Sequence, residues 1–119
     1  MNRISDEIKK FMLQGAFMPF NPLSNKPVFL EFNGQFVLPV FSTKEKFDEA
    51  AKWAGFTFAT CSVIIDPEDF KNSVLAYKNK FNFHVAADPY ITEEGNTRFQ
   101  LIPFDEEEKS YLEKKDGQS

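Results

Sequence analysis

The only histidine of the chain, His84, is the first residue to examine for catalytic chemistry. Asp88 and Tyr90 follow it in the stretch HVAADPY, which brings an imidazole, a carboxylate and a phenol close together in sequence. Such a trio could transfer a proton or hold a ligand. The competing interpretation places His84 beside Asn82 on the less apolar face of a strand, because a working site needs several convergent groups. We favour this second interpretation and keep a small enzyme or ligand-binding domain using His84, Asp88 and Tyr90 as the alternative.

Other reactive residue types are isolated in the sequence. Cys61 lies in an apolar stretch without a neighbouring base, which is typical of a buried small hydrophobe rather than a nucleophile. One histidine and one distant cysteine give no metal-ligand spacing. The five glycines are scattered and form no phosphate-binding loop. Glu93 and Glu94 fall in a predicted turn, where acidic side chains are usually solvated. We therefore predict no catalytic residue, no metal and no cofactor.

The net charge of −4 is spread unevenly along the chain. From Asp105 onward there are six acidic residues against three lysines, whereas the preceding part is close to neutral. With only two arginines and no basic cluster, the chain lacks the groups that bind phosphate backbones, so we predict no nucleic-acid partner. The longest largely apolar run, 55–65, is shorter than the ~20 residues of a membrane span. The single cysteine and the absence of a signal-like segment predict a cytoplasmic protein.

Aromatic residues are in excess, at 16% of the chain with fifteen phenylalanines. A small core has limited room for so many rings, and rings left outside would form an interface with another protein. The candidate interface residues are Phe17, Met18, Phe20, Trp53 and Tyr90. In the competing interpretation, the first three only fasten a proline-rich connector across a sheet. The sequence leaves both interpretations open.

The elements that would position these residues follow from periodicity and turn signals. Ile4, Ile8 and Phe11 predict an N-terminal helix within 1–15. The prolines of 16–27 forbid regular structure and predict an ordered, extended connector. Asn33-Gly34 predicts a hairpin turn between strands over 27–32 and 35–41. A capping box of Ser42 and Glu45 would then start a helix whose core face carries the residues Phe47, Ala50, Ala51 and Ala54.

The second half of the chain also alternates between predicted strands and a predicted helix. We predict a strand over 56–65, a helix begun by Asp66-Pro67, and strands over 81–86 and 97–104. The acidic tail, 105–119, can form a helix that frays, with Tyr111 and Leu112 as its only docking residues. The order α-β-β-α-β-α-β-β-(α) predicts one α+β domain over 1–104, with a mixed or mostly antiparallel sheet of about five strands and two or three packed helices.

The stretch FVLPVFSTKEKFDEAAKW (36–53) resembles the N-terminal domain of the SseB family, named for enhanced serine sensitivity. The resemblance rests on the run Pro39 to Ser42, on Trp53, and on the order of elements over 27–103. It implies a small α+β domain with a binding or regulatory role and no established catalytic site. It carries over no functional residue, because the matched motif explains folding rather than chemistry.

The sequence therefore predicts a non-enzymatic cytoplasmic protein-interaction domain that acts through an aromatic-rich surface. Its partner would be another protein of unknown identity, and a homodimer formed through an exposed hairpin edge or an aromatic patch is a further possibility. Neutralisation of a toxin or of another cellular machine would also suit a small acidic protein of this kind.

Overall fold

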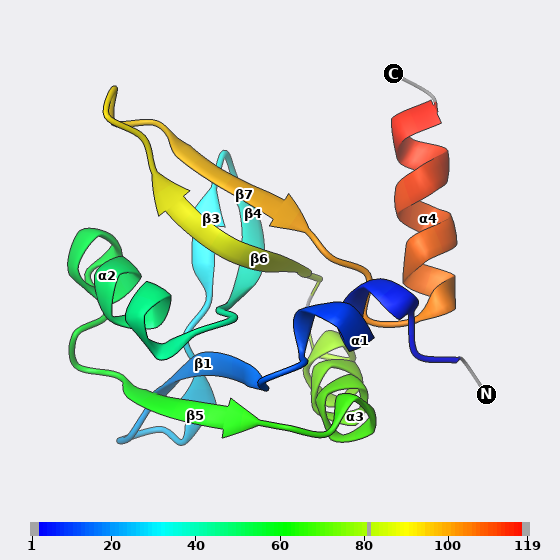
Figure 1. Ribbon diagram of the computed structural model, residues 1–119, viewed down its shortest axis with the longest axis horizontal. Coiled ribbons are helices and arrows are strands. Elements are labelled where there is room, and N and C mark those ends of the chain that lie inside the picture. The colour runs from blue at the N-terminus through cyan, green and yellow to red at the C-terminus, as the bar shows by residue number, and fades with distance from the viewer. Residues whose placement is uncertain (1–2, 81, 118–119) are drawn as a thin grey trace.

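The computed structural model describes residues 3–80 and 82–117 and has the predicted α+β class, in one domain (Figure 1). The described residues form four helices: α1 (Asp6–Phe11), α2 (Lys44–Ala54), α3 (Pro67–Lys78) and α4 (Glu106–Gly117). Their strands are β1 (Ala16–Asn21), β2 (Lys26–Pro27), β3 (Leu30–Phe32), β4 (Gln35–Val40), β5 (Thr60–Ile64), β6 (His84–Ile91) and β7 (Thr97–Leu101).

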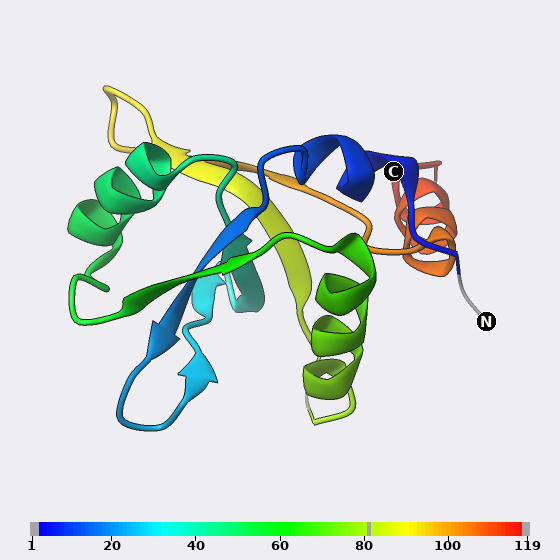
Figure 2. The same ribbon diagram turned by 60° about the horizontal axis from the view of Figure 1, so that its bottom comes forward.

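The strands form two sheets instead of the single five-stranded sheet that we predicted. One sheet has the order β2-β1-β5 and the other β3-β4-β6-β7, and all neighbours are antiparallel except β4 and β6. The sheets touch where Phe17 of β1 and Phe41, just after β4, exchange two backbone hydrogen bonds of 2.9 Å. The parallel pair is joined through α2, β5 and α3, which brings β6 back beside β4 (Figures 1 and 2).

Two apolar clusters hold these elements together. Three phenylalanines, Phe41, Phe47 and Phe56, form the smaller cluster with Ala50 and Ala51 under α2, and their ring centroids lie 5.6–6.3 Å apart. The spacing of the α2 residues thus predicted a real core face, with Ala54 at its half-buried margin. The larger cluster joins α1 and α3 to both sheets through the residues Ile8, Met12, Ala16, Met18, Leu38, Val40, Phe70, Val74, Phe83, Val85, Ile102 and Phe104.

The segment 16–27 is largely extended, as predicted, but the prediction that its prolines forbid regular structure was wrong, because it contains β1 and β2. Pro19 is tolerated inside β1 for a reason that the backbone hydrogen bonds reveal. The carbonyl of Pro19 accepts from the amide of Val28 at 2.9 Å, just beyond the two residues of β2. In an antiparallel ladder the amide and carbonyl of one residue point the same way, so the missing amide faces this weakly paired side and leaves the β5 ladder intact.

The predicted capping box at Ser42 was also wrong. Thr43 is the N-cap of α2, and its side chain accepts from the amide of Lys46 at 3.2 Å. Ser42 instead donates its amide and its hydroxyl to the carboxylate of Asp88, both at 2.8 Å. Ser42 therefore bonds to Asp88, which is distant in sequence, although local spacing had assigned Ser42 to the helix cap.

Several helices and strands begin or end at other residues than predicted, for related reasons. The N-terminal helix is only α1, because Ile4 pairs with Asp105 in an antiparallel bridge. The strand predicted over 27–32 splits into β2 and β3, and the one predicted over 56–65 begins only at Thr60. β6 continues to Ile91 instead of ending near 86, since it passes Asp88 through a register shift at a positive φ of 46°. Residue 81 of the predicted fourth strand lies outside the described residues.

Two local signals are confirmed in detail. Asn33 and Gly34 have φ values of 51° and 82°, as a tight hairpin turn between β3 and β4 requires. Asp66 caps α3 by accepting from the amide of Glu68, and Pro67 is its first helical residue. Both motifs satisfy their hydrogen bonds within four residues, so they do not depend on the rest of the fold.

Candidate functional site

The five residues predicted at an interface divide into two groups. Met18 is 1% exposed and belongs to the larger core cluster, so its assignment to an interface was wrong. Phe17 and Phe20 are half-buried and pack against the smaller and the larger cluster, respectively. These side chains fasten β1 to the cores, as the competing interpretation expected, because β1 lies between two apolar layers.

Trp53 and Tyr90, by contrast, come together at one groove between α2 and β6. The groove has a volume of about 280 Å³, and its lining residues are Lys46, Glu49, Ala50, Trp53, Asp88, Pro89 and Tyr90. Trp53 is half-buried and packs against the smaller cluster, while 57% of Tyr90 is exposed. Ala50 and Pro89 are buried and add apolar surface to the lining of the groove. We call this site the α2–β6 groove.

The position of the α2–β6 groove depends on Asp88. Its carboxylate holds Ser42, at the entry to α2, through two hydrogen bonds, and Lys46 of α2 lies 3.4 Å from Asp88 Oδ2. The positive φ at Asp88 and the register shift between Ala87 and Tyr90 redirect the strand at this point. Asp88 therefore links the helix that carries Trp53 to the strand that carries Tyr90.

The α2–β6 groove has the composition of a recognition surface rather than of a reaction centre. Its titratable groups are Lys46, Glu49, Asp88 and Tyr90, which include both signs of charge, and the rest of its lining is aromatic or aliphatic. No histidine or cysteine is among the described residues that line it. Such a surface can bury an apolar side chain and hydrogen-bond to its flanks.

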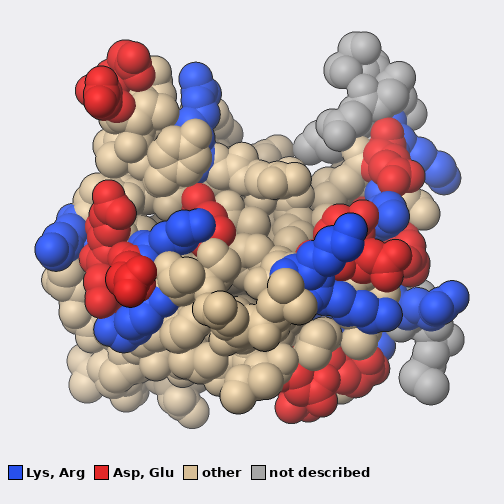
Figure 3. Space-filling model, in the orientation of Figure 1, with Lys and Arg blue, Asp and Glu red and all other residues tan. Residues whose placement is uncertain are grey.

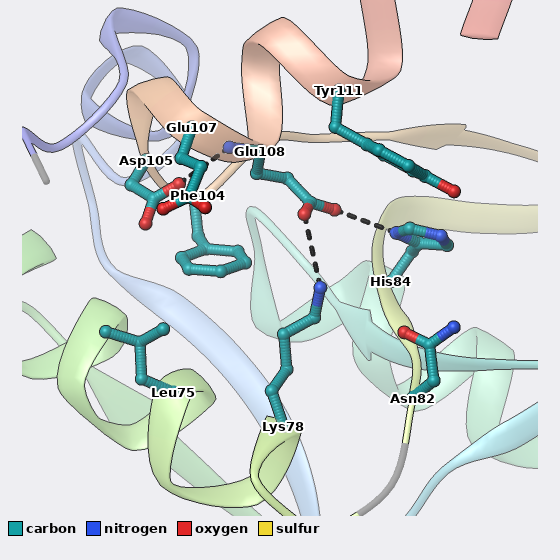
Figure 4. A pocket seen from close by; sticks show the side chains of 9 residues that line it. All are labelled: Leu75, Lys78, Asn82, His84, Phe104, Asp105, Glu107, Glu108 and Tyr111. Atoms are coloured by element: carbon teal, nitrogen blue, oxygen red, sulfur yellow. Dashed lines mark hydrogen bonds and ion pairs between the residues drawn. The ribbon is translucent and has the colours of Figure 1, made fainter.

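His84 lies elsewhere, so the predicted grouping of His84 with Asp88 and Tyr90 was wrong. Four residues of extended chain separate His84 from Asp88, which is about 13 Å along β6. His84 is 8% exposed and its Nδ1 donates to Glu108 Oε1 of α4 at 2.8 Å, while Lys78 of α3 lies 3.1 Å from Glu108 Oε2 (Figure 4). The Tyr111 ring stacks on the imidazole at a centroid distance of 5.9 Å.

These side chains line a hollow of about 400 Å³ whose walls come from α3, β6 and α4 (Figure 4). A carboxylate bonded to Nδ1 orients an imidazole for proton transfer. The other described lining residues are Leu75, Asn82, Phe104, Asp105 and Glu107, so the described part of the wall offers no serine, threonine or cysteine as a nucleophile. The arrangement joins three elements, with Glu108 at its centre.

Glu108 is held as a carboxylate. Burial acts to raise the pKa of Glu108, but the hydrogen bond from His84 and the charge of Lys78 outweigh it, so the pKa is lowered. The same helix is fixed at its start, where Asp105 Oδ1 accepts from the Glu108 amide at 2.8 Å and the Glu106 amide donates to the Arg3 carbonyl at 2.8 Å. The C-terminal segment thus docks through polar contacts as well as through the stacking of Tyr111 on His84.

The sequence analysis missed Glu108 and Lys78. The one available signal was the spacing of Asp105 and Glu108, three residues apart at the start of an apparent helix, which is the spacing of a capping box. It could have predicted a fixed helix start. It could not have predicted the partner of Glu108, which lies 24 residues away in β6.

Cys61 is half-buried in β5 and packs against the smaller cluster. Burial raises the pKa of the Cys61 thiol, the opposite of what a nucleophile needs. Within 3–80 and 82–117, no group of three or more histidine, cysteine, aspartate and glutamate side chains has an arrangement that could hold a metal ion.

Comparison with known proteins gave no relative from which a site could be transferred: no model of a known protein family matches the chain, and neither does any curated protein. Among the described helices, none combines the length and the apolar character needed to cross a lipid bilayer.

Proposed function

We propose that the chain is a non-enzymatic protein-interaction domain whose contact surface is the α2–β6 groove. The observation that carries this proposal is that Trp53 and Tyr90, which are 37 residues apart in sequence, line one groove together with Pro89. Tyrosine and tryptophan dominate the energetics of protein interfaces when they surround a pocket that a partner can fill. The partner is another protein, and a cytoplasmic location remains our prediction for both.

The size of the α2–β6 groove restricts what it can take. Its volume of about 280 Å³ lies at the lower limit of pockets that enclose a small molecule, so it fits one or two side chains of a partner. Aromatic grooves of this kind suit extended segments with proline or apolar side chains, which lose little conformational entropy on binding. The mixed charges of Lys46 and Glu49 would then contact the polar flanks of that segment. The binding or regulatory role that the SseB resemblance implies agrees with this proposal.

The single tryptophan of the chain makes a direct test possible, because all tryptophan emission comes from the proposed site. Peptides are selected from a display library of random short sequences and then titrated into the protein while Trp53 emission is recorded. We expect selected peptides to shift that emission at micromolar concentration. Tyr90→Ala should weaken binding at least about tenfold, as truncation of a central interface aromatic does.

Leu23→Ala is the matched control, since Leu23 is 96% exposed and lies in the turn between β1 and β2, outside the groove. It should leave the affinity unchanged. Peptides that bind a folded Trp53→Ala, Tyr90→Ala double variant as tightly as the native protein would contradict the proposal. A library that yields no peptide able to change Trp53 emission would contradict it equally.

The enzyme alternative required His84, Asp88 and Tyr90 to lie together. Asp88 and Tyr90 line a different site from His84. What remains is His84 with Glu108 and Lys78, and these three residues are bonded to one another between α3, β6 and α4. A polar contact of this kind suits the anchoring of a helix. Turnover of any substrate that disappears in a stable His84→Ala variant would restore the alternative.

A further inference from the structure

One strand at a sheet edge differs from the others in its residues. β2, β3 and β7 are edge strands as well, and they carry Lys26 with Pro27, Glu31 and Arg98, respectively. Charged residues and proline at an edge oppose pairing with another strand. β5, with the sequence TCSVI, has neither, although it is the outer strand of the β2-β1-β5 sheet. Among the described edges, β5 is therefore the one without protection against pairing.

The hydrogen-bond register shows which β5 groups face outward. In β1, Phe17 and Pro19 direct their backbone groups away from β5, to Phe41 and Val28. Their neighbours across the ladder, Val63 and Cys61, are thus in non-hydrogen-bonded pairs. The amides and carbonyls of Cys61 and Val63 consequently point to the open side of β5, at the 6–7 Å spacing that a second strand recognises.

Much of the exposed surface beside this edge is apolar. Leu13 is 85% exposed and Ile65 is 75% exposed, and they flank the β1–β5 ladder where Ala16 pairs with Ile64. Val63 is half exposed, and Phe58 is exposed ahead of the strand. The surface over β5, at the lower left in Figure 3, is built largely of uncharged side chains. Charged residues lie near its two ends, where Lys44, Asp48 and Lys52 of α2 line a hollow with Cys61, and where the strand leads into the acidic first turn of α3. An exposed apolar patch of this kind marks an association site.

We propose that β5 pairs with β5 of a second copy of this chain, antiparallel, about a two-fold axis at Ser62. In this register Cys61 of each copy faces Val63 of the other, so all four outward backbone groups of each strand gain a partner. A second copy is the occupant that the edge itself favours. The strand offers no charge with which to select a different protein, and its apolar flanks are self-complementary under the two-fold rotation.

This interface is independent of the α2–β6 groove, which lies against the other sheet. Each copy in the dimer keeps its own groove, and the dimer would present two grooves in a fixed relation. A contact between two five-residue strands and their flanks is small, so we expect a dissociation constant on the order of 10–100 µM.

Sedimentation equilibrium between about 10 µM and 1 mM tests the pairing, a range set by the affinity expected for so small an interface. The mass of the native protein should rise from 13.8 kDa toward twice that value. Val63→Pro should remain monomeric, because it removes an outward amide and no amide of the β1 ladder. Val63→Lys provides a second variant with a different disruption, a charge at the edge. Leu23→Lys introduces the same charge away from β5 and should dimerise like the native protein.

Amide hydrogen exchange identifies the edge without any mutation. At low concentration the amides of Thr60, Ser62 and Ile64 should be protected by β1, and those of Cys61 and Val63 should exchange fast. At high concentration Cys61 and Val63 should become protected as well. A protein that stays monomeric at 1 mM overturns the proposal, because this concentration is about ten times the largest dissociation constant that we expect. A dimer in which these two amides still exchange fast overturns it as well. A dimer abolished by Trp53→Ala but not by Val63→Lys would also overturn it.

Discussion

Asp88 accepts two hydrogen bonds from Ser42, one from the backbone amide and one from the hydroxyl, each 2.8 Å long. The two residues are separated by 46 positions and come from β6 and from the entry to α2. This contact fixes the distance between the helix that carries Trp53 and the strand that carries Tyr90. It is therefore the structural basis of the α2–β6 groove.

We expect Asp88→Ala to destabilise the protein by about 2–3 kcal/mol, because it removes two hydrogen bonds to a carboxylate and leaves alanine at a positive φ. Asp88→Asn is the matched control. Its amide can still accept from the Ser42 amide and donate to the Ser42 hydroxyl, and asparagine tolerates a positive φ. Urea unfolding should show a much smaller loss for Asp88→Asn. Equal losses would mean that the negative charge of Asp88, and not the geometry of its hydrogen bonds alone, stabilises the contact with Ser42.

Tyr90→Ala should change binding without changing stability. Tyr90 is 57% exposed, and an exposed side chain away from caps and networks usually contributes within about 0.5 kcal/mol to the free energy of unfolding. Trp53→Ala should cost more stability, since Trp53 packs against the smaller cluster. Thermal unfolding of both variants checks this difference. A large loss of stability in Tyr90→Ala would show that the ring belongs to the core and is not free for a partner.

The docking of α4 should depend on pH through Glu108. The pKa of Glu108 is lowered from 4.5 in the folded protein, since His84 and Lys78 outweigh the effect of burial. A carboxyl group whose pKa is lowered by folding stabilises the fold above its unfolded pKa, and this contribution disappears as the pH falls through the folded pKa. The stabilisation should therefore be complete at pH 6–7 and decrease below about pH 4.5.

Glu108→Gln isolates this effect. At neutral pH we expect it to lower the free energy of unfolding by about 2 kcal/mol, the value typical of hydrogen bonds to a charged group. The difference from the native protein should shrink as the pH falls below 4.5, because the native carboxylate becomes protonated as well. Urea unfolding at a series of pH values measures it. A difference that stays constant down to pH 3 would exclude the charge of Glu108 as the cause.

Cys61 should react slowly with thiol reagents at neutral pH. Burial raises the pKa of its thiol, which reduces the fraction of thiolate, and only the thiolate attacks. The rate of modification by a disulfide reagent should be lower than that of a free cysteine, and it should recover in urea. A folded protein that reacts faster than free cysteine would show an activated thiol and would reopen the question of a nucleophile at Cys61.

The secondary-structure elements that were predicted well are those with hydrogen bonds close in sequence. Asn33-Gly34 and Asp66-Pro67 carry their turn and cap within a few residues, and the stripe from Phe47 to Ala51 needs only the helical period. The errors at Pro19 and Ser42 have one common origin. In each case the backbone found a partner from a distant element, Val28 after β2 and Asp88 in β6, that local spacing does not encode.

The candidate sites show the same difference between features encoded locally and features that depend on distant segments. The excess of aromatic residues pointed to a contact surface, and Trp53 and Tyr90 were named without knowledge that they meet. Met18 was misassigned because the sequence does not show that both faces of β1 are covered. His84 was grouped with Asp88 by proximity in sequence, whereas its partner Glu108 comes from α4.

The sequence by itself determined the α+β class, most helices and the tight turns, because periodicity and capping act over three or four residues. The tertiary structure decided the two sheets, the α2–β6 groove and the polar anchoring of α4. Each of these depends on pairing between distant segments, such as β4 with β6 or Ser42 with Asp88, and the energy of such a pairing exists only when the whole core brings both partners together. The open edge of β5 belongs to the same group, since a strand becomes an edge only through the order of its sheet.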